Sequence, residues 1–388
     1  MLKHLGPLVS ADIELGKVNL LIGCQSSGKS CVLKAACYCT WVEKRIELTQ
    51  SIEEFNGEAF LKKFIEYHKM DGYVHDDTLI SYESSYMKFK YDNSNKSFEF
   101  GWKTHRWEYR RPKVSYIPSE RSIVSLLSDV LLLNSYDNII DFVGDWDLAR
   151  KNITGDLGIL DLGVKYRYVE DKGMDKVLLP SGQELQLTNT SSGVQSLVPL
   201  YVHLNYLKNT LHSSEKSRSQ KTKKEESGLL LTLYRLRFLK KGKTEIRFDG
   251  SGPQQFAILP IGEYQLPFSS QKYAEEFKAV YSRFQETDHL DLFIEEPEDN
   301  LFPPTQCRLI DWILDLSNDA PRSTYMIATH SPYVLNHILS NQPKGFKLFF
   351  TYPVGRGMSA IKTATESDIQ EIFDNGVDMF FNFETFLD

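Results

Sequence analysis

The first strongly apolar run of the chain leads directly into a stretch rich in glycine and serine. Residues 18–22 read Val-Asn-Leu-Leu-Ile, a pattern typical of a buried strand. Beyond the glycine- and serine-rich stretch, apolar side chains recur at the spacing of one helical face; they are Leu33, Ala36, Cys37 and Trp41. The pattern therefore predicts a strand, a loop and a helix in direct succession.

Further strands and helices are predicted in the N-terminal third. Residues 10–15 read as a strand before a turn, and residues 41–68 continue the helical pattern. From Asp71 the period changes to two, which predicts three strands; they are residues 78–83, 87–91 and 97–102. We interpret these strands as an antiparallel β subdomain inserted after the first helix. A strand at residues 113–118 then returns to the central sheet.

The middle of the chain alternates between helical and strand patterns. Residues 121–161 have a helical pattern rich in Leu and Ile, and residues 164–187 read as strands around a turn. A helix with an apolar face opens at residues 189–196. Residues 208–227 are polar and basic, and we expect them to form a solvated or disordered insert.

Strands and helices also alternate in the C-terminal part. We expect helices near residues 270–285, from Pro303 and from Ser367. The expected strands are a run that ends at residues 293–296, a run from Thr324 that ends in polar residues, and the segments 346–352 and 358–363.

The glycine- and serine-rich stretch carries the first chemical motif. Residues 23–30 read G-x-x-x-x-G-K-S, the pattern of a phosphate-binding P-loop. Its backbone N–H groups can wrap phosphates, and the helix N-terminus adds a favourable dipole. Lys29 can reach the β- and γ-phosphates, and Ser30 can ligate Mg²⁺. A chance match in a turn is the alternative, and the flanking strand and helix argue against it.

A pair of acids ends the apolar run at residues 293–296, which read Phe-Ile-Glu-Glu. This is the form of a Walker B strand end. Glu295 can hold the hydration shell of Mg²⁺, and Glu296 can orient or deprotonate an attacking water molecule. The alternative is a strand that ends in a solvated acidic turn, and the P-loop in the same chain favours the functional interpretation.

Two weaker signals involve His330 and the Ser192-Gly193 pair. His330 closes a strand that has the pattern of a buried one; such a histidine is often structural, but here it suits a γ-phosphate sensor. Ser192 and Gly193 open a helix, which makes them either an anion site or a plain helix cap.

Four motifs thus follow one another along the chain. They are residues 23–30, residues 191–195 (Ser-Ser-Gly-Val-Gln), residues 294–301 (Ile-Glu-Glu-Pro-Glu-Asp-Asn-Leu) and residues 328–332 (Ala-Thr-His-Ser-Pro). In this order they resemble the P-loop, signature, Walker B with D-loop, and switch histidine of ABC-type ATPase heads of the SMC, RecF and OLD group. The chain is especially similar to the AAA-family ATPases of prokaryotic anti-phage defence systems. The sequence motif Glu-Glu-Pro-Glu-x-x-Leu is more typical of these defence and OLD-type ATPases than of transporters.

The resemblance implies an α/β fold: a P-loop NTPase head with a central mixed sheet, an antiparallel β subdomain and a helical lobe. We expect a single ATPase head over residues 1–388. Its parts would be an N-terminal nucleotide-binding lobe with the β subdomain, a helical lobe that carries the signature and the polar insert, and a C-terminal lobe with Walker B and the switch histidine. Their expected bounds are residues 1–118 (β subdomain about 71–112), 119–287 (insert 208–227) and 288–388.

The resemblance also implies a composite site for ATP and Mg²⁺, so that hydrolysis depends on dimerisation. ATP held by one subunit would be capped by the signature of a second, with Glu296 as catalytic base, His330 as γ-phosphate sensor, and Ser30 and Glu295 at the metal. The implied nucleotide-binding residues are Gly23, Gln25, Ser26, Ser27, Gly28, Lys29, Ser30 and Cys31, together with Ser192 and Gly193 of the second subunit. Asn300 would lie at the dimer seam.

The chain departs from the family pattern in several places. The signature lacks its second glycine, and residues 116–121 (Tyr-Ile-Pro-Ser-Glu-Arg) stand where the Q-loop glutamine is usual. No long coiled coil is present in the pattern. Only 58 residues follow His330 (388 − 330), too few for the Toprim nuclease domain of OLD-type proteins. We therefore expect any nuclease effector to be a separate chain.

Composition and charge narrow the choice of partner and of cellular compartment. The net charge of −7 argues against a generic polyanion binder, and no apolar run approaches the ~20 residues of a membrane helix. The five cysteines show no disulfide framework and no signal peptide is apparent, which indicates a cytoplasmic protein without membrane partners. Residues 103–113 are basic and aromatic and make DNA a candidate partner, although a charged sheet face is the favoured interpretation.

We therefore interpret the chain as an ATP-binding and hydrolysing ABC/SMC-like ATPase. It would form a homodimer or higher homo-oligomer around ATP and act as sensor or scaffold of an anti-phage defence complex, controlling a separate effector such as a nuclease. The alternatives are a RecF-like DNA-repair ATPase and a non-hydrolysing, ATP-dependent scaffold.

Overall fold

The computed structural model describes residues 1–126, 137–210, 228–239, 257–261 and 264–375. Neighbouring parallel strands form one half of its largest sheet. In spatial order they are β7 (Arg111–Ile117), β14 (Thr287–Glu295), β15 (Thr324–Ala328), β3 (Val18–Gly23) and β16 (Phe346–Gly355). The first five residues of β3 are buried, as expected for a parallel strand that is covered on both faces.

The other half of this 11-stranded sheet is largely antiparallel. Continuing outward from β16, the strands are β17 (Met358–Thr363), β2 (Leu8–Ala11), β1 (Leu2–Leu5), β4 (Val74–Glu83), β5 (Met87–Asp92) and β6 (Ser97–Trp102). Of these junctions, β17 with β2 is parallel and the others are antiparallel. The antiparallel strands β4 to β6 are therefore hydrogen-bonded to the central sheet through β1.

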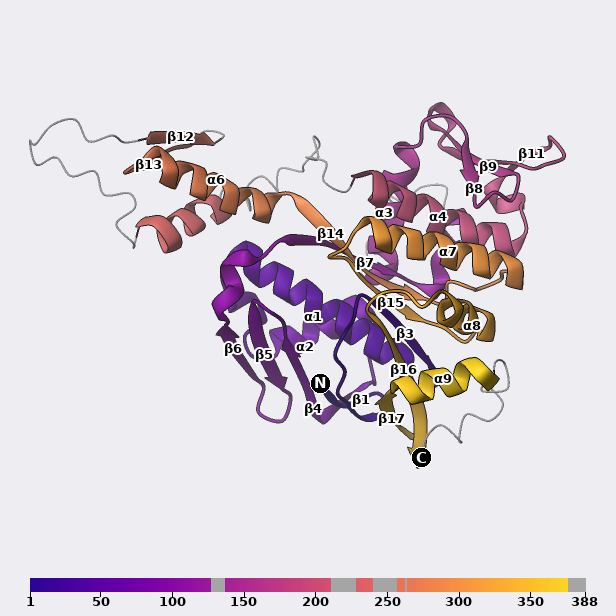
Figure 1. Ribbon diagram of the computed structural model, residues 1–388, viewed down its shortest axis with the longest axis horizontal. Helices are drawn as coiled ribbons and strands as arrows, with labels where there is room; N and C mark the ends of the chain where they lie inside the picture. Colours follow the sequence, from indigo (N-terminus) through magenta and orange to yellow (C-terminus); the bar gives the residue numbers. More distant parts are fainter. Residues whose placement is uncertain (127–136, 211–227, 240–256, 262–263, 376–388) are drawn as a thin grey trace, which may run out of the picture.

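Helix α1 (Lys29–Thr49) lies between the two halves of the sheet (Figure 1). One apolar cluster contains side chains from the helix and from both halves. Its members include Val32, Leu33 and Tyr38 of α1, Phe293 and Met326 of the parallel strands, and Ile80 and Phe89 of the antiparallel strands. The short helices η1 (Glu53–Phe55) and α2 (Ala59–His68) close this layer with an aromatic group around Phe60.

The opposite face of the parallel strands is covered by a second apolar cluster. The helices that contribute to it are α3 (Asn138–Lys151), α4 (Ser192–Thr210), α7 (Pro303–Asp319), α8 (Pro332–Asn341) and α9 (Glu366–Asn375). A small antiparallel sheet packs beside α3 and α4. Its strands are β8 (Leu157–Ile159), β9 (Val164–Val169), β10 (Met174–Leu178) and β11 (Glu184–Gln186).

A third apolar cluster belongs to a segment that extends away from the sheet (Figure 1). It joins helix α6 (Gln271–Gln285), the hairpin of β12 (Ala257–Ile261) and β13 (Tyr264–Phe268), and the helical residues 228–239. Tyr109, just before β7, contacts Phe284 of α6, with ring centroids 5.2 Å apart, so this cluster reaches the start of β7.

The predicted fold class is confirmed: the structure is α/β, with a central mixed sheet, an antiparallel β extension and a helical lobe. The order of strand β3, glycine-rich loop and helix α1 was predicted correctly. The strands at 78–83, 87–91 and 97–102, the strands within 164–187 and the helix near 270–285 were also predicted correctly. Of the polar insert 208–227, residues 211–227 lie outside the described part of the chain.

Three predictions were wrong in detail. The strand expected at residues 10–15 lies at Leu8–Ala11, because this segment pairs with β1, a four-residue strand whose pattern was too short to recognise. The helix expected over residues 41–68 is interrupted, because Gln50 adopts a left-handed φ of 53° that ends α1. The helical pattern expected over residues 121–161 ends in strand β8, and residues 127–136 are not described.

Among the described residues, no helix is both long and apolar enough to cross a membrane.

The hairpin of β12 and β13 was not predicted from the sequence.

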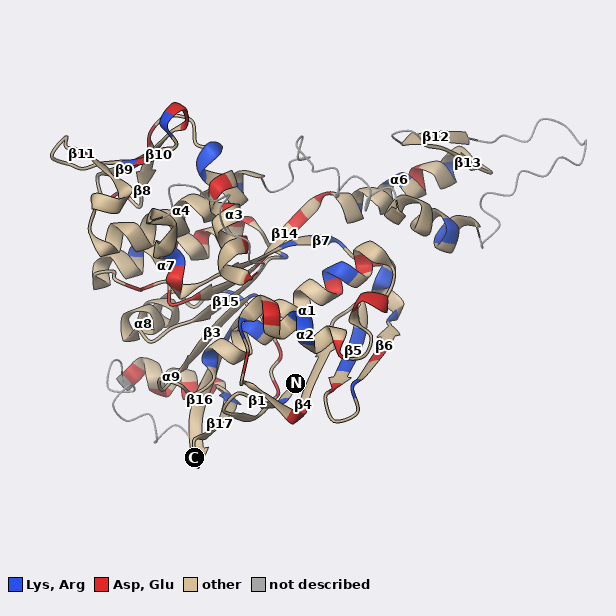
Figure 2. Cartoon of the chain, turned by 180° about the vertical axis from the view of Figure 1, so that it is seen from behind, with Lys and Arg blue, Asp and Glu red and all other residues tan. Residues whose placement is uncertain are grey.

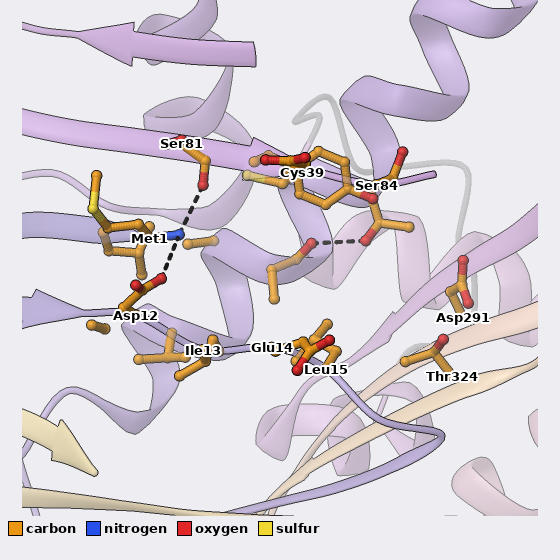
Figure 3. A pocket seen from close by; sticks show the side chains of 18 of the residues that line it. Met1, Asp12, Ile13, Glu14, Leu15, Cys39, Ser81, Ser84, Asp291 and Thr324 are labelled. Atoms are coloured by element: carbon orange, nitrogen blue, oxygen red, sulfur yellow. Dashed lines mark hydrogen bonds and ion pairs between the residues drawn. The ribbon is translucent and has the colours of Figure 1, made fainter. Parts of the chain in front are cut away.

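A cavity of about 710 Å³ lies beside α1 and is lined by helix residues from Val32 to Thr40 (Figure 3). Its lining includes Asp12, Cys39, Ser84 and Asp291. The N-terminal amine of Met1 also lines it, donates a hydrogen bond to the carbonyl of Ser81 at 2.9 Å and lies 4.0 Å from the Asp12 carboxylate.

Glu43 of α1 is a buried acid close to this cavity. Its Oε2 atom has no hydrogen-bond partner. Burial raises the pKa of the Glu43 carboxyl to about 7, against the opposing effect of hydrogen bonds from Ser84 and Tyr82. The folded chain therefore keeps this proton at pH values where the unfolded chain has lost it.

Glu43 gives a testable pH dependence of stability. Between about pH 4.5 and pH 7 the folded state binds more protons at this site than the unfolded state, so its contribution to the free energy of unfolding falls as pH rises. Glu43→Gln removes this loss. We expect the stability of the variant relative to wild type to increase by about 2–3 kcal/mol between pH 5 and pH 7.5, measured by urea denaturation.

The matched control is Glu53→Gln, because the Glu53 side chain is exposed to solvent. This variant should show the same pH dependence of unfolding as wild type. If Glu43→Gln also follows the wild-type curve, Glu43 is not a protonated buried acid in the folded chain.

Candidate functional site

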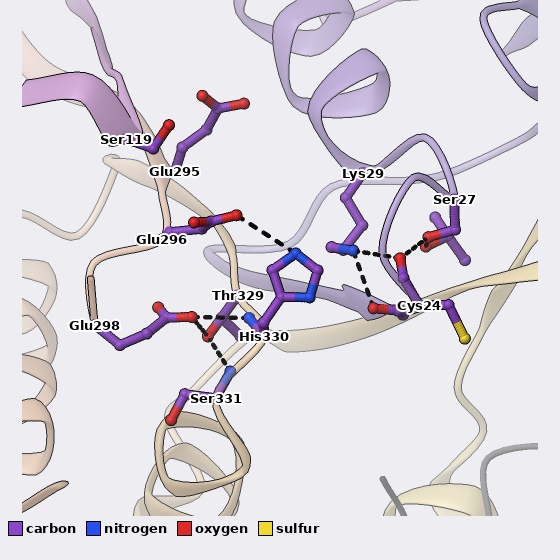
Figure 4. Close-up of polar contacts among 12 residues, drawn as sticks. Cys24, Ser27, Lys29, Ser119, Glu295, Glu296, Glu298, Thr329, His330 and Ser331 are labelled. Carbon is purple, nitrogen blue, oxygen red and sulfur yellow. Dashed lines mark hydrogen bonds and ion pairs between the residues drawn. The ribbon is translucent and has the colours of Figure 1, made fainter. Parts of the chain in front are cut away.

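The carboxyl ends of four neighbouring parallel strands bring the predicted motifs to one edge of the sheet. The P-loop follows β3, the paired acids follow β14, and His330 follows β15. In the strand register Glu295 pairs with Ala328, and Gly23 pairs with Thr351 of β16, so the strand ends are level. Figure 4 shows Lys29, Glu296 and His330 facing one another across this edge.

Lys29, the first residue of α1, is folded back over the P-loop. Its Nζ atom donates to the carbonyl oxygens of Gly23 at 2.9 Å and Cys24 at 2.7 Å (Figure 4). Burial lowers the pKa of Lys29 to about 8, although the nearby charges of Glu296 and Glu298 act in the opposite direction. The ammonium group is thus partly dehydrated and held by neutral carbonyl groups.

The helix start leaves backbone donors available at the same place. The N–H of Val32 donates to Gly28 at 3.1 Å. The N–H groups of the preceding helical residues Lys29, Ser30 and Cys31 precede the first intrahelical bond, as at any helix N-terminus. These donors and the helix dipole favour an anion at this position.

Some side chains of the loop are exposed to solvent and others are buried beneath it. Cys24, Gln25, Ser26 and Ser30 are exposed, whereas Ser27 and Gly28 are buried. The Cys31 side chain is buried in the apolar cluster around α1, and burial raises its pKa to about 11. Of Cys31, therefore, only the backbone is placed to face a ligand.

Thr351 of β16 lies beneath the loop and contacts it. The sequence alone did not predict this contact. Its Oγ1 atom lies 2.5 Å from the Ser27 hydroxyl, which also donates to the Cys24 carbonyl at 2.6 Å. A Cβ atom at Gly23 would lie 2.2 Å from the Thr351 carbonyl oxygen, so only glycine fits at this position. Nothing in the local sequence around residue 351 indicated this contact, because it joins segments far apart in the chain.

Glu295 is the last residue of β14 and its side chain is buried. Its Oε1 atom has no hydrogen-bond partner, and the buried hydroxyl of Tyr116 on the neighbouring strand has none either. Burial raises the pKa of the Tyr116 hydroxyl well above its usual range, and the charge of Glu295 adds to the effect. The structure therefore leaves an unsatisfied carboxylate oxygen at the end of the strand.

Glu296 turns the chain away from the strand. It adopts a left-handed φ of 42°, and its N–H donates to the Ala328 carbonyl at 2.8 Å. Pro297 disfavours helix at the preceding residue, and the left-handed conformation of Glu296 makes the turn. The Glu296 Oε1 atom lies 3.4 Å from Nε2 of His330. The hydrogen bond with His330 lowers the pKa of the Glu296 carboxyl, as do the charges of His330 and Lys29.

His330 is held through its backbone by Glu298. The Glu298 Oε1 atom accepts hydrogen bonds from the His330 N–H at 2.8 Å and from the Thr329 hydroxyl at 2.7 Å. Glu298 is buried deeply enough that burial raises the pKa of its carboxyl. The histidine ring remains partly exposed and is directed toward Glu296 (Figure 4).

The predicted signature lies on the far side of the paired acids. Helix α4 begins at Ser192, and a Cβ atom at Gly193 would lie 2.8 Å from the Asn300 carbonyl oxygen. Asn300 itself has a left-handed φ of 60°. In the part of the chain that the structure describes, no hydrogen bond joins Ser192 or Gly193 to residues 23–31. The predicted signature is thus packed against the predicted D-loop of its own chain, at Asn300.

The residues at this edge fit a hydrated Mg²⁺ better than a protein-only metal site. Within the described ranges, no group of three or more His, Cys, Asp or Glu side chains is arranged to hold a metal ion. Mg²⁺ bound with a nucleotide takes most of its ligands from phosphates and water and only one or two from the protein. The unpartnered Oε1 of Glu295 and the exposed hydroxyl of Ser30 are the candidates for that role.

The basic stretch 103–113 is engaged within the chain. The Arg106 guanidinium lies 3.5 Å from the ring centroid of Trp102, Arg110 pairs with Asp288 at 3.0 Å, and Arg111 donates to a backbone carbonyl at 3.1 Å. Figure 2 shows basic and acidic residues intermixed over β4, β5 and β6. These contacts favour the interpretation of this stretch as a charged face of the sheet.

Comparison with known proteins gives distant structural similarity only. No protein-family model matches the sequence, and no curated protein matches it. The chain is similar to the SMC head domain from Thermotoga maritima, with 12% identity, coverage of 94% of this chain and 97% of that chain, and a TM-score of 0.41. It is also similar to an Smc head domain with an extended coiled coil from Pyrococcus furiosus, bound to the C-terminal domain of ScpA, with 10% identity, coverage of 96% and 97%, and a TM-score of 0.42.

A third similar structure is an Smc head bound to the C-winged helix domain of ScpA, with 11% identity, coverage of 96% and 98%, and a TM-score of 0.41. These similarities concern the overall fold, and no residue role is taken from them. The chain is thus an α/β protein in which a P-loop sequence, paired acids and a histidine meet at one edge of a mixed sheet.

Proposed function

We propose that this protein is an ABC/SMC-like ATPase that binds ATP with Mg²⁺ at the carboxyl edge of the parallel strands and hydrolyses it. The observation that carries the proposal is the convergence of Lys29, Glu296 and His330 from three different strand ends. A turn that merely resembled a P-loop would not require an acid and a histidine from distant segments beside it.

On phosphate binding, Lys29 would exchange its backbone carbonyl partners for phosphate oxygens. In the structure the Lys29 ammonium is held by the carbonyls of Gly23 and Cys24. The charged oxygens of a β- or γ-phosphate are stronger acceptors than neutral carbonyls, so Lys29 would turn toward them. The N–H groups at the start of α1 would bind the same anion.

Hydrolysis would use Glu296 as the proton acceptor. Since its pKa is lowered, Glu296 is ionised at neutral pH and can accept a proton from a water molecule. The water oxygen then bonds to the γ-phosphorus, and the bond from the γ-phosphorus to the bridging oxygen breaks to give ADP and phosphate. His330, 3.4 Å from Glu296, would orient the acid and contact the γ-phosphate. Mg²⁺, held through Glu295 and Ser30, would supply charge neutralisation on the phosphates.

The position of the signature supports a dimeric arrangement. Ser192 is exposed at the start of α4 and makes no hydrogen bond with the P-loop of its own chain within the described residues. An exposed helix N-terminus beside the D-loop is suited to bind the γ-phosphate of a nucleotide on a second copy. We infer that ATP joins two copies through such composite sites.

The biological role that we propose is that of sensor or scaffold in an anti-phage defence complex, with a separate effector such as a nuclease. Its support is the Glu-Glu-Pro-Glu-x-x-Leu motif of residues 295–301. A RecF-like repair ATPase is less well supported, because the basic side chains Arg106, Arg110 and Arg111 already have partners within the chain.

The first test removes the P-loop cation. In Lys29→Ala the phosphates lose a charge-assisted hydrogen bond of about 1.5–3 kcal/mol, so ATP affinity should fall by about 10- to 100-fold. Isothermal titration calorimetry with Mg-ATP measures this change, and a phosphate-release assay should show no turnover. The control is Lys62→Ala, an exposed lysine of α2 that pairs with Glu66 and should leave both quantities unchanged. Wild-type affinity and turnover in Lys29→Ala would contradict the nucleotide site.

The second test concerns hydrolysis and assembly together. Glu296→Gln keeps the size of the side chain but cannot accept a proton, so ATP should bind and be cleaved only at a slow residual rate. We expect a long-lived dimer or higher assembly in Mg-ATP, measured by size-exclusion chromatography with light scattering. Adding Ser192→Arg, which blocks the proposed contact, should abolish the assembly.

The control for the added arginine is Ser181→Arg, placed at an exposed turn of the small sheet. The Glu296→Gln protein with Ser181→Arg should still assemble. Equal mass distributions for Glu296→Gln with and without Ser192→Arg would contradict the composite site.

A further inference from the structure

Arg121 is a buried side chain to which the mechanism above assigns no role. It lies in the short helix η3 (Ser119–Ser125) directly after β7, and its exposed fraction is 0%. The guanidinium donates hydrogen bonds to five backbone carbonyl oxygens. These are Pro118 at 3.3 Å, Ser196 at 3.2 Å, Glu295 at 3.0 Å, Glu296 at 2.8 Å and Pro297 at 3.3 Å.

The choice of partners is unusual for a buried arginine. Taking a charge out of water costs several kcal/mol, and a carboxylate partner within the same pocket is the common way to offset it. Arg121 forms no ion pair within the described residues, and its donors go to carbonyl groups instead. The carboxylates of Glu295 and Glu296 are consequently left for other partners. Their negative charge still favours the guanidinium at longer range.

Three of the five carbonyls belong to consecutive residues, 295–297, that form the turn after β14. A rigid guanidinium fork that binds several carbonyls fixes their relative orientation, which a flexible lysine ammonium cannot do. The three hydrogen bonds from Arg121 therefore fix the path of the backbone through this turn.

The residue at the centre of the turn is in a costly conformation. Glu296 has a left-handed φ of 42°, which a residue with a side chain adopts only when its surroundings hold it there. Its two peptide groups are held from opposite sides. The Glu296 N–H donates to Ala328 at 2.8 Å, and its carbonyl accepts from Arg121 Nη2 at 2.8 Å. With both groups fixed, the carboxylate is directed to His330.

We propose that Arg121 is the positioning residue of the hydrolytic reaction: it holds the backbone of Glu296 so that the carboxylate meets the attacking water. This inference rests on the proposed function of Glu296. Arg121 itself touches neither nucleotide nor water, and it acts through the turn.

The hydrogen bond to Ser196 adds a connection to the signature helix. Ser196 lies in α4, one turn after Ser192, and its carbonyl accepts from Arg121 Nε. The same guanidinium thus joins the start of α4 to the turn of the paired acids. A displacement of α4 would be transmitted to Glu296 through this side chain.

The test is a double-mutant cycle between Arg121 and Glu296. Arg121→Lys keeps the positive charge but cannot bind the turn carbonyls as a fork. Misplacing a catalytic group by about 1 Å can cost about 100-fold in rate, so we expect kcat to fall by about 10- to 100-fold. KM and ATP affinity should stay within about twofold of wild type, because Arg121 donates to no P-loop atom. Single-turnover hydrolysis of labelled ATP measures even slow variants.

The decisive comparison is made in the Glu296→Gln background. If Arg121 acts through Glu296, its replacement should change the residual rate of Glu296→Gln by less than about twofold. A merely structural role would lower the rate by the same factor in both backgrounds. That additive result, with an active wild type, would overturn the proposal for Arg121 alone. A wild-type protein that hydrolyses no ATP would instead contradict the proposed function.

Arg150→Lys is the matched control for replacing a buried arginine. Arg150 is also buried, but it pairs with Asp147 at 2.7 Å and Asp175 at 2.9 Å, away from the paired acids. Arg150→Lys should lower the melting temperature without lowering kcat of the folded enzyme. A fall in kcat equal to that of Arg121→Lys would show that loss of any buried arginine impairs turnover, and would overturn the proposal.

Discussion

The burial of helix α1 between the two halves of one sheet is the constraint on which the site depends. The helix begins at Lys29, immediately after the P-loop, and its apolar side chains pack on parallel strands on one side and antiparallel strands on the other. Because both sides are covered, the helix cannot shift along the sheet without losing apolar contacts on both. Its N-terminus is thereby held at the ends of β3, β14 and β15. The N–H groups at the start of α1, the acids and the histidine share one edge for this reason.

The sequence predicted which segments meet at the sheet edge, because the P-loop stretch, the paired acids and His330 each lie at the end of an apolar strand pattern. The P-loop after β3 and the acids at the end of β14 needed only the apolar runs before them. It could not predict contacts between distant segments. Thr351 under the loop and Arg121 behind the turn act across separations of more than 170 residues, and neither belongs to a repeating pattern. Arg121 lies in residues 116–121, where the family pattern has a glutamine, and nothing in that stretch indicates its contacts.

The conformation of Glu296 illustrates the same limit. Pro297 favours a turn before it, but the left-handed backbone at Glu296 is held by hydrogen bonds with Ala328 and Arg121, which are distant in the sequence. The strained residue is also the proposed proton acceptor, as is common where function requires a conformation that local preference disfavours. The strand predicted at residues 10–15 is misplaced because β1 and β2 are short strands, and their pairing decides their bounds.

The central claim is that Lys29 leaves its carbonyl partners for the phosphates of ATP while Arg121 keeps the turn in place. An experimental structure with Mg²⁺ and a non-hydrolysable ATP analogue tests it most directly. We expect the Nζ of Lys29 to bind the β- and γ-phosphates and to have left Gly23 and Cys24, with Glu296 facing the γ-phosphate. An analogue bound elsewhere, with Lys29 still on the carbonyls of Gly23 and Cys24, would contradict the account.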